Sequence, residues 1–152
     1  MDRIDANILK CLTKDARMNA SQISQKVNLS VSAVIERMKK MEASGIIRGY
    51  TAVIDERLAG YDVQALISIR LEHPKYNQEF NRQMCNHDRV MECFYITGDF
   101  DFMLRVVTDN TQSLEHLLNL VKSIPGVQNT RTILILSSVK EEHSVDPDEL
   151  LK

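Results

Sequence analysis

Glycine and cysteine are scarce in this chain of 152 residues, which contains five glycines and three cysteines. No glycine-rich loop that could cradle a phosphate is present, and neither an HExxH motif nor a Ser/His/Asp order occurs. The cysteines (Cys11, Cys85 and Cys93) are odd in number and lack CxxC spacing, which favours reduced thiols. No apolar run reaches the length of a membrane span, and the first residues do not resemble a signal peptide. We therefore expect a cytoplasmic globular protein without a membrane segment or cofactor, and not an enzyme.

The net charge of −2 is divided unevenly along the chain. Residues 1–50 contain nine Lys or Arg and five Asp or Glu, a net charge of +4, whereas residues 51–152 carry −6. A globular domain does not require such an uneven distribution of charge, whereas contact of the positive region with nucleic acid would explain it. The first third of the chain is therefore the candidate region for DNA binding.

Three amphipathic segments within residues 2–45 predict a helix-turn-helix unit. In the first segment, Ile4, Ile8 and Leu12 recur every four residues. Asn19 is placed to cap the second helix, and Asn28-Leu29-Ser30 forms the polar break before the third. Gly45 is placed to end the third helix. The predicted inward stripe of that helix consists of Val31, Val34, Ile35, Met38 and Met41.

The outward face of the third helix places small residues first and basic residues after them. It consists of Ser32, Ala33, Glu36, Arg37, Lys39 and Lys40. This order suits a helix in a DNA major groove, where short groups approach bases and basic groups meet phosphates. The alternative is an ordinary helical hairpin with a solvated charged face, on which Glu36 and Lys40 form a surface ion pair.

The second half predicts an α+β domain. Residues 46–54 are rich in β-branched and aromatic side chains and indicate a strand or an extended linker. The following elements are expected at residues 63–71 (strand), 76–84 (helix), 90–97 (strand), 100–107 (strand), 111–124 (helix) and 127–139 (strand). This βαββαβ order is that of a ferredoxin-like sandwich.

Four regions are predicted from these patterns. They are a helix-turn-helix domain (1–46), a linker strand and hinge (47–61), a ferredoxin-like domain for effector sensing and oligomerisation (62–140), and a polar tail (141–152) that is either mobile or a short helix. The run from Ile133 to Leu136 is apolar on both strand faces, which favours sheet-to-sheet dimerisation over an ordinary core.

The turn at residues 98–101 contains two carboxylates, Asp99 and Asp101, which admit three interpretations. Paired carboxylates perform acid–base catalysis or hold divalent ions, but no histidine or further acidic cluster accompanies them in sequence. A Gly-Asp dipeptide is also an ordinary turn. The third interpretation is a carboxylate that binds the ammonium group of an amino acid. Cys85, His87 and Cys93 do not match zinc-ligand spacing.

The chain resembles the Lrp/AsnC family of transcription regulators, also called feast/famine regulators, from Asp2 to about Lys140. The matching residues are Met1 to Asp5, Ile8-Leu9, Leu29-Ser30, Glu36-Arg37, Met41-Glu42, Gly45 to Ile47, Gly49 to Ala52, Gly98 to Asp101, Pro125 to Val127 and Thr130 to Thr132. Each of these matches alone is weak evidence for the family, but all of them in this order and spacing are specific to it. One departure is Val31, because the family often has proline after the capping serine, and this affects base preference more than fold.

The resemblance implies dimers that pair through their sheets, often octamers of four dimers, and amino-acid effectors bound between dimers. Carried over by position, it places double-stranded DNA against Ser30, Ser32, Ala33, Arg37 and Lys40. It places the effector against Ile96, Gly98, Asp99, Phe100, Asp101, Met103, Thr130, Thr132 and Ile133.

The predicted function is sequence-specific DNA binding that responds to a small amino acid such as leucine or methionine. Mixed apolar and polar side chains near the turn permit an apolar effector, which is the preferred interpretation. The alternatives are an effector-independent DNA-organising protein and a small ferredoxin-like enzyme, although a catalytic set for the latter is not visible.

Overall fold

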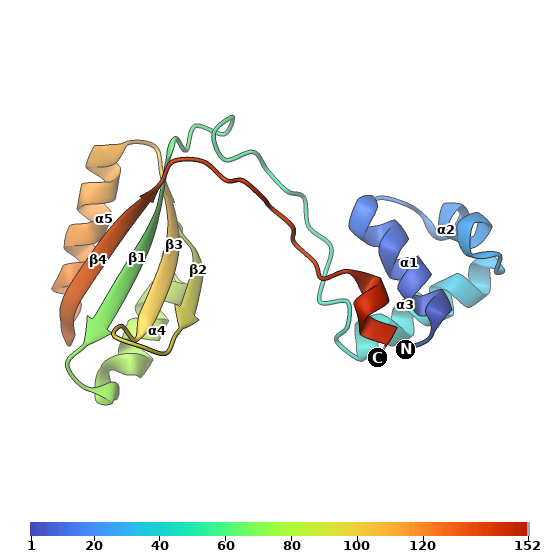
Figure 1. Ribbon diagram of the computed structural model, residues 1–152, viewed down its shortest axis with the longest axis horizontal. Coiled ribbons are helices and arrows are strands. Elements are labelled where there is room, and N and C mark those ends of the chain that lie inside the picture. The colour runs from blue at the N-terminus through green and yellow to red at the C-terminus, as the bar shows by residue number, and fades with distance from the viewer. Residues whose placement is uncertain (152) are drawn as a thin grey trace. The chain divides into compact units, whose positions relative to one another are not determined.

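A computed structural model describes residues 1–151, which form two compact units (Figure 1). The helical unit comprises Met1–Val53 together with the C-terminal residues from Lys140 onward, and the sheet unit comprises Ile54–Val139. No helix in the described part of the chain is both long and apolar enough to cross a membrane.

The helical unit contains three helices, α1 (Arg3–Lys14), α2 (Ala20–Val27) and α3 (Val31–Ala43). None of them is long enough to be stable alone in water, so each depends on the shared core. The buried side chains of that core are Ile8, Leu9, Leu12, Ile23, Val34 and Met41. This arrangement confirms the predicted helix-turn-helix.

Side-chain caps begin the first two helices. Asp2 accepts from the Asp5 N–H at 2.9 Å while the Asp5 carboxylate accepts from the Asp2 N–H at 2.9 Å, a reciprocal capping box. Asn19 and Gln22 form a second box with the same two distances. Asn28 ends α2 in the left-handed conformation at φ 54°, as its place in the polar break predicts. These local signals set where the helices start and stop.

The C-terminal segment adds a short 3₁₀ helix, η2 (Pro147–Leu151), to the helical unit. Pro147 is buried, and Asp148 forms an ion pair with Lys10 of α1. Of the two alternatives for the tail, the structure therefore has the short helix, and its contacts explain why a polar segment is ordered.

Of the two alternatives for the linker, a strand or an extended segment, the single chain does not have the strand, because residues 47–61 contain none. Residues 50–55 have no regular structure, and turns follow at residues 56–60. A β-strand requires hydrogen bonds to a neighbouring strand, and sequence preference alone does not supply one.

The sheet unit has the predicted order of elements. They are β1 (Val63–Leu71), η1 (Pro74–Tyr76), α4 (Asn77–Cys85), β2 (Val90–Tyr95), β3 (Phe102–Thr108), α5 (Thr111–Ser123) and β4 (Val127–Ile135). The strands lie in the order β2-β3-β1-β4 and every neighbouring pair is antiparallel (Figure 1). This is the ferredoxin-like arrangement predicted from the sequence.

Strand β4 is shorter than the predicted 127–139. It ends at Ile135, whose partner Gln64 is the second residue of β1, so little of β1 remains to pair with residues beyond it. Leu134 and Leu136 are 51% and 86% exposed, so this apolar run is not buried within the single chain, and the predicted sheet-to-sheet dimerisation stays a prediction.

Both helices of the sheet unit pack on one face of the sheet. One core cluster joins Phe80 and Met84 of α4 with Leu114, Leu117 and Val121 of α5. It also contains every second residue of β1 and β3: Ala65, Ile67, Ile69 and Leu71, with Phe102, Leu104 and Val106. Because side chains alternate along a strand, Leu66, Met103 and Ile133 project from the opposite face.

The turn between α5 and β4 requires glycine. Gly126 has φ +90°, and a Cβ there would lie 2.2 Å from Cγ and Cδ2 of Tyr76. The ring of Tyr76 packs against the core at this point. Glycine fits here because it has no Cβ to clash with Tyr76 and because it adopts a positive φ without strain.

Candidate DNA-binding and effector sites

The start of α3 is fixed by Ser30. Its hydroxyl oxygen accepts from the Ala33 N–H at 3.2 Å and lies 3.1 Å from the Ser32 hydroxyl. The predicted capping role of Ser30 is confirmed. Ser32 is exposed and Ala33 is half-buried, so Ser32 is the freer of the two to approach a ligand.

Arg37 is anchored within the helical unit. Its Nη1 lies 2.7 Å from a carboxylate oxygen of Asp2 and 2.7 Å from one of Asp5. The same two carboxylates form the capping box of α1, so one guanidinium nitrogen joins α3 to the start of α1. Hydrogen bonds to Asp5 and Asp2 raise the pKa of Arg37. The capping N–H of Asp5, and then Arg37, hold the pKa of Asp2 below its usual value.

The inward stripe predicted for α3 is partly wrong. Val34 and Met41 are buried and Met38 packs against the core, but Val31 and Ile35 are each 41% exposed. A stripe of five apolar side chains is wider than the face that α1 and α2 cover. The outward face therefore carries apolar as well as polar and basic groups, and Lys39 and Lys40 are exposed at its far end.

Tyr50 closes the C-terminal end of α3, a role that the sequence did not indicate. Its hydroxyl donates to the Glu42 carboxylate at 2.8 Å. Partial burial, and then the hydrogen bond to Glu42, raise the pKa of Tyr50 to about 12. Residues just after the helices thus help to hold α3.

In the candidate effector region, Asp101 ties the β2–β3 turn to β1. Its carboxylate Oδ2 accepts from the Leu71 N–H at 2.7 Å, and its N–H donates to the Ile69 carbonyl at 2.9 Å. The Ile96 N–H donates to the Asp101 carbonyl at 2.8 Å. The Leu71 contact falls at a register shift between Arg70 and Leu71, where the ladder alone does not satisfy the backbone.

The other residues of the turn are less constrained. Asp99 is exposed, Gly98 adopts φ +113°, and Phe100 is half-buried. Asp99 and Asp101 therefore do not form a matched pair, because Asp101 bonds to the backbone of β1. Within residues 1–151, no three His, Cys, Asp or Glu side chains are grouped to hold a metal ion.

The remaining predicted effector residues are divided between the two faces of the sheet. Thr130 and Thr132 pair with Ile69 and Ile67 and share their core side, whereas Ile133 pairs with Leu66 on the opposite side. Met103 pairs with Ser68 and also lies on the opposite side. Thr130 and Met103 lie nearest the turn, because Thr130 pairs with Ile69, whose carbonyl accepts from the Asp101 N–H, and Met103 is the second residue of β3.

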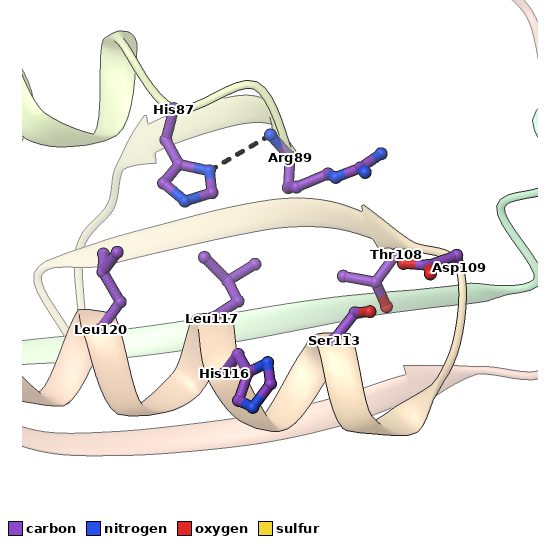
Figure 2. A pocket seen from close by; sticks show the side chains of 8 residues that line it. All are labelled: His87, Arg89, Thr108, Asp109, Ser113, His116, Leu117 and Leu120. Atoms are coloured by element: carbon purple, nitrogen blue, oxygen red, sulfur yellow. Dashed lines mark hydrogen bonds between the residues drawn. The ribbon is translucent and has the colours of Figure 1, made fainter.

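A hollow of about 220 Å³ lies elsewhere, between α5 and the loop before β2 (Figure 2). Its lining residues are His87, Arg89, Thr108, Asp109, Ser113, His116, Leu117 and Leu120. In Figure 2, His87 lies across from Leu117 and Leu120, and its Nδ1 accepts from the Arg89 N–H at 3.2 Å. None of the predicted effector residues lines this hollow.

A helix-turn-helix joined in one chain to a ferredoxin-like domain defines a class, the DNA-binding transcription regulators. Residues 1–48 match the winged helix-turn-helix DNA-binding family, and residues 64–145 match the Lrp/AsnC ligand binding domain. The chain belongs to the Lrp/AsnC family, whose members are transcription regulators rather than enzymes.

Curated relatives and solved structures match nearly the whole chain. It is 36% identical to the HTH-type transcriptional regulator FL11 of Pyrococcus abyssi over 93% of each protein. It is 32% identical to the leucine-responsive regulatory protein of Escherichia coli, over 94% of this chain and 89% of that protein. A Neisseria meningitidis transcriptional regulator, solved as a complex with L-methionine, has a TM-score of 0.94 at 27% identity and 99% coverage of both chains.

Proposed function

We propose that this protein regulates transcription in the cytoplasm as a homo-oligomer whose DNA binding responds to an apolar amino acid, leucine or methionine. The observation that carries the proposal is the pairing of a complete helix-turn-helix with a Lrp/AsnC ligand binding domain. The names of its relatives point to the same ligands, because one is called leucine-responsive and another was solved with L-methionine.

On the DNA side, α3 enters the major groove. Ser32 and Ala33 approach base edges near its start, and Lys40 meets a phosphate. Ser30 and Arg37 hold the helix in place, through the cap and the two aspartates respectively. The positive charge of residues 1–50 attracts the DNA backbone.

On the effector side, the ligand lies between copies of the chain. The predicted residues cannot surround a ligand within one chain, because the intervening sheet separates Thr132 from Met103 and Ile133. A second copy placed against the turn of residues 98–101 would bring such groups together. Asp99, which is exposed, is available to bind an ammonium group.

The assembly forms through the open face of the sheet, as a dimer and then an octamer of four dimers. On this face, Phe94 and Ile133 are 49% and 42% exposed in the single chain. Burying such apolar surface is the main source of affinity in obligate oligomers. An effector bound between copies shifts DNA affinity only if it favours one assembly over another.

A gel-shift titration tests the proposal. Full-length protein is titrated onto a duplex selected from random sequences, with and without each of the twenty amino acids. We expect a sequence-specific shift that leucine or methionine changes in midpoint or mobility. Absence of any shift at low salt would refute DNA binding, and a shift that no amino acid changes would favour an effector-independent DNA-organising protein.

A further inference from the structure

Two apolar side chains on α3 lie outside the buried core of the helical unit. Val31 and Ile35 are each 41% exposed, and neither is among the buried or partly buried side chains that form the core of the helical unit. Their neighbours Val34 and Met38, by contrast, are buried and packed against the core respectively. Stability of the unit therefore does not explain why these two positions are apolar.

Their spacing places them together on the surface of α3. Residues four apart on a helix are neighbours, so Val31 and Ile35 form one continuous apolar strip. The strip starts at the first residue of α3, directly after the Ser30 cap. In helix-turn-helix proteins the N-terminal part of the recognition helix is the part that contacts base edges.

The chemistry of the major groove identifies what such a strip can contact. Among the groups that the four base pairs present there, the C5-methyl group of thymine is the apolar one, and the others are hydrogen-bond donors or acceptors. The surrounding charge is suited to DNA, since residues 1–50 carry +4 and Lys39 and Lys40 are exposed further along α3.

We propose that Val31 and Ile35 determine part of the DNA sequence specificity by packing against thymine methyl groups in the major groove. The proposal rests on α3 being the helix that binds DNA, and it adds residues that carry no hydrogen-bonding group. Ile35, with the larger side chain and a position one turn into the helix, makes the larger contribution. The preferred half-site then contains thymine at the positions that Val31 and Ile35 face.

Replacement of thymidine by 2′-deoxyuridine tests this directly, because it removes the methyl group and leaves base pairing unchanged. Each thymine of a selected duplex is replaced in turn, and the dissociation constant of the full-length protein is measured. At the position that Ile35 faces we expect about fourfold weaker binding, the effect of one buried methyl-sized group. For Ile35→Ala the ratio between the two duplexes should fall toward one.

A matched control is available in Ile46→Ala. Ile46 is 47% exposed in the same unit but lies after the end of α3, so this substitution should leave the thymine-to-uracil ratio as in the parent protein. Ile35→Thr keeps one of the branched methyl groups and should give an intermediate ratio. Thermal unfolding checks that all three variants retain their fold, which is expected because the side chains are exposed.

Three results would overturn the proposal. The first is tight, specific binding of the selected duplex with no methyl effect at any thymine. The second is an equal methyl effect in the parent protein and Ile35→Ala. The third is a change in oligomeric state on Ile35→Ala with the ratio unchanged, which would assign the strip to a second copy of the chain. Failure to bind any duplex would instead refute the proposed function itself.

Discussion

The helical unit and the sheet unit keep their shapes by different means. In the helical unit a small apolar core is supplemented by polar contacts at the surface: two capping boxes, the Arg37 bridge and the Tyr50–Glu42 bond. The sheet unit has a larger apolar core, with Asp101 fixing the turn to β1 and Arg105 paired with two glutamates. The surface proposed for DNA is complete on one helix, whereas the residues proposed for the effector lie on two faces of a sheet. Under the proposed function, sensing requires assembly, whereas each chain carries the surface for DNA contact on one helix.

The largest expected effect is a loss of stability of the sheet unit. Gly126→Ala forces a Cβ into the ring of Tyr76 and strains a backbone at φ +90°. We expect the free energy of unfolding of the sheet unit to fall by about 2–4 kcal/mol. Gly60→Ala is the matched control, because Gly60 has φ +91° but nothing within 4 Å of its Cβ position. Its cost should be about 1 kcal/mol. Equal costs in urea unfolding would contradict the role assigned to Tyr76.

Substitutions of Asp101 distinguish a structural role of this side chain from a role in effector sensing. Asp101→Ala leaves the Leu71 N–H without its acceptor and should cost about 1–2 kcal/mol. Asp101→Asn retains an acceptor oxygen, so it should cost less while removing one negative charge from the turn that carries Asp99, the proposed ammonium ligand. We expect Asp101→Asn to bind DNA normally and to lose the effector response in the gel shift. If the effector changes DNA binding by Asp101→Asn as much as it does for the parent protein, the role of Asp101 is only to hold the turn.

Arg37 tests how far polar contacts support the helical unit. Arg37→Ala leaves two aspartates without their cation, and we expect a loss of about 1 kcal/mol. Arg82→Ala removes the more exposed pair with Glu79 and should cost less than Arg37→Ala.

The salt dependence of DNA binding distinguishes two ways in which Arg37 could act. If Arg37 acts only by holding α3, its loss weakens binding without changing the slope of log affinity against log salt concentration. If it contacts a phosphate as well, the slope decreases by about one.

The smallest effect concerns Tyr50. Its raised pKa, about 12 against an ordinary value of 10.0, means that the folded helical unit disfavours the ionised phenol. Its stabilising contribution is complete below pH 10 and is lost as the pH rises toward 12. Tyr50→Phe should remove this part of the alkaline loss of stability, as measured by unfolding at pH 9 and pH 11. An identical pH dependence in both proteins would show that the phenol ionises freely.

The sequence predicts the local features of both units well. Asn19, Asn28 and Ser30 act at the helix ends where their side chains predict, because caps depend on residues at most four positions apart. The order of strands and helices along the chain follows from the succession of periodic segments in the sequence.

What the sequence did not predict depends on distant partners. Arg37 meets Asp2 and Asp5, more than thirty residues earlier, and nothing in its local pattern indicates them. The end of β4 is set by where β1 begins, and the exposure of Ile35 is set by the limited width of the core.

The claim that sensing requires assembly is tested most directly by calorimetric titration of L-leucine and L-methionine into the full-length protein over a range of protein concentrations. Mass photometry or sedimentation measures the oligomeric state at each concentration. The account predicts that amino-acid binding appears only where the protein is assembled, and that its stoichiometry follows the number of contacts between copies. Binding of the same affinity and stoichiometry by the monomer would contradict it.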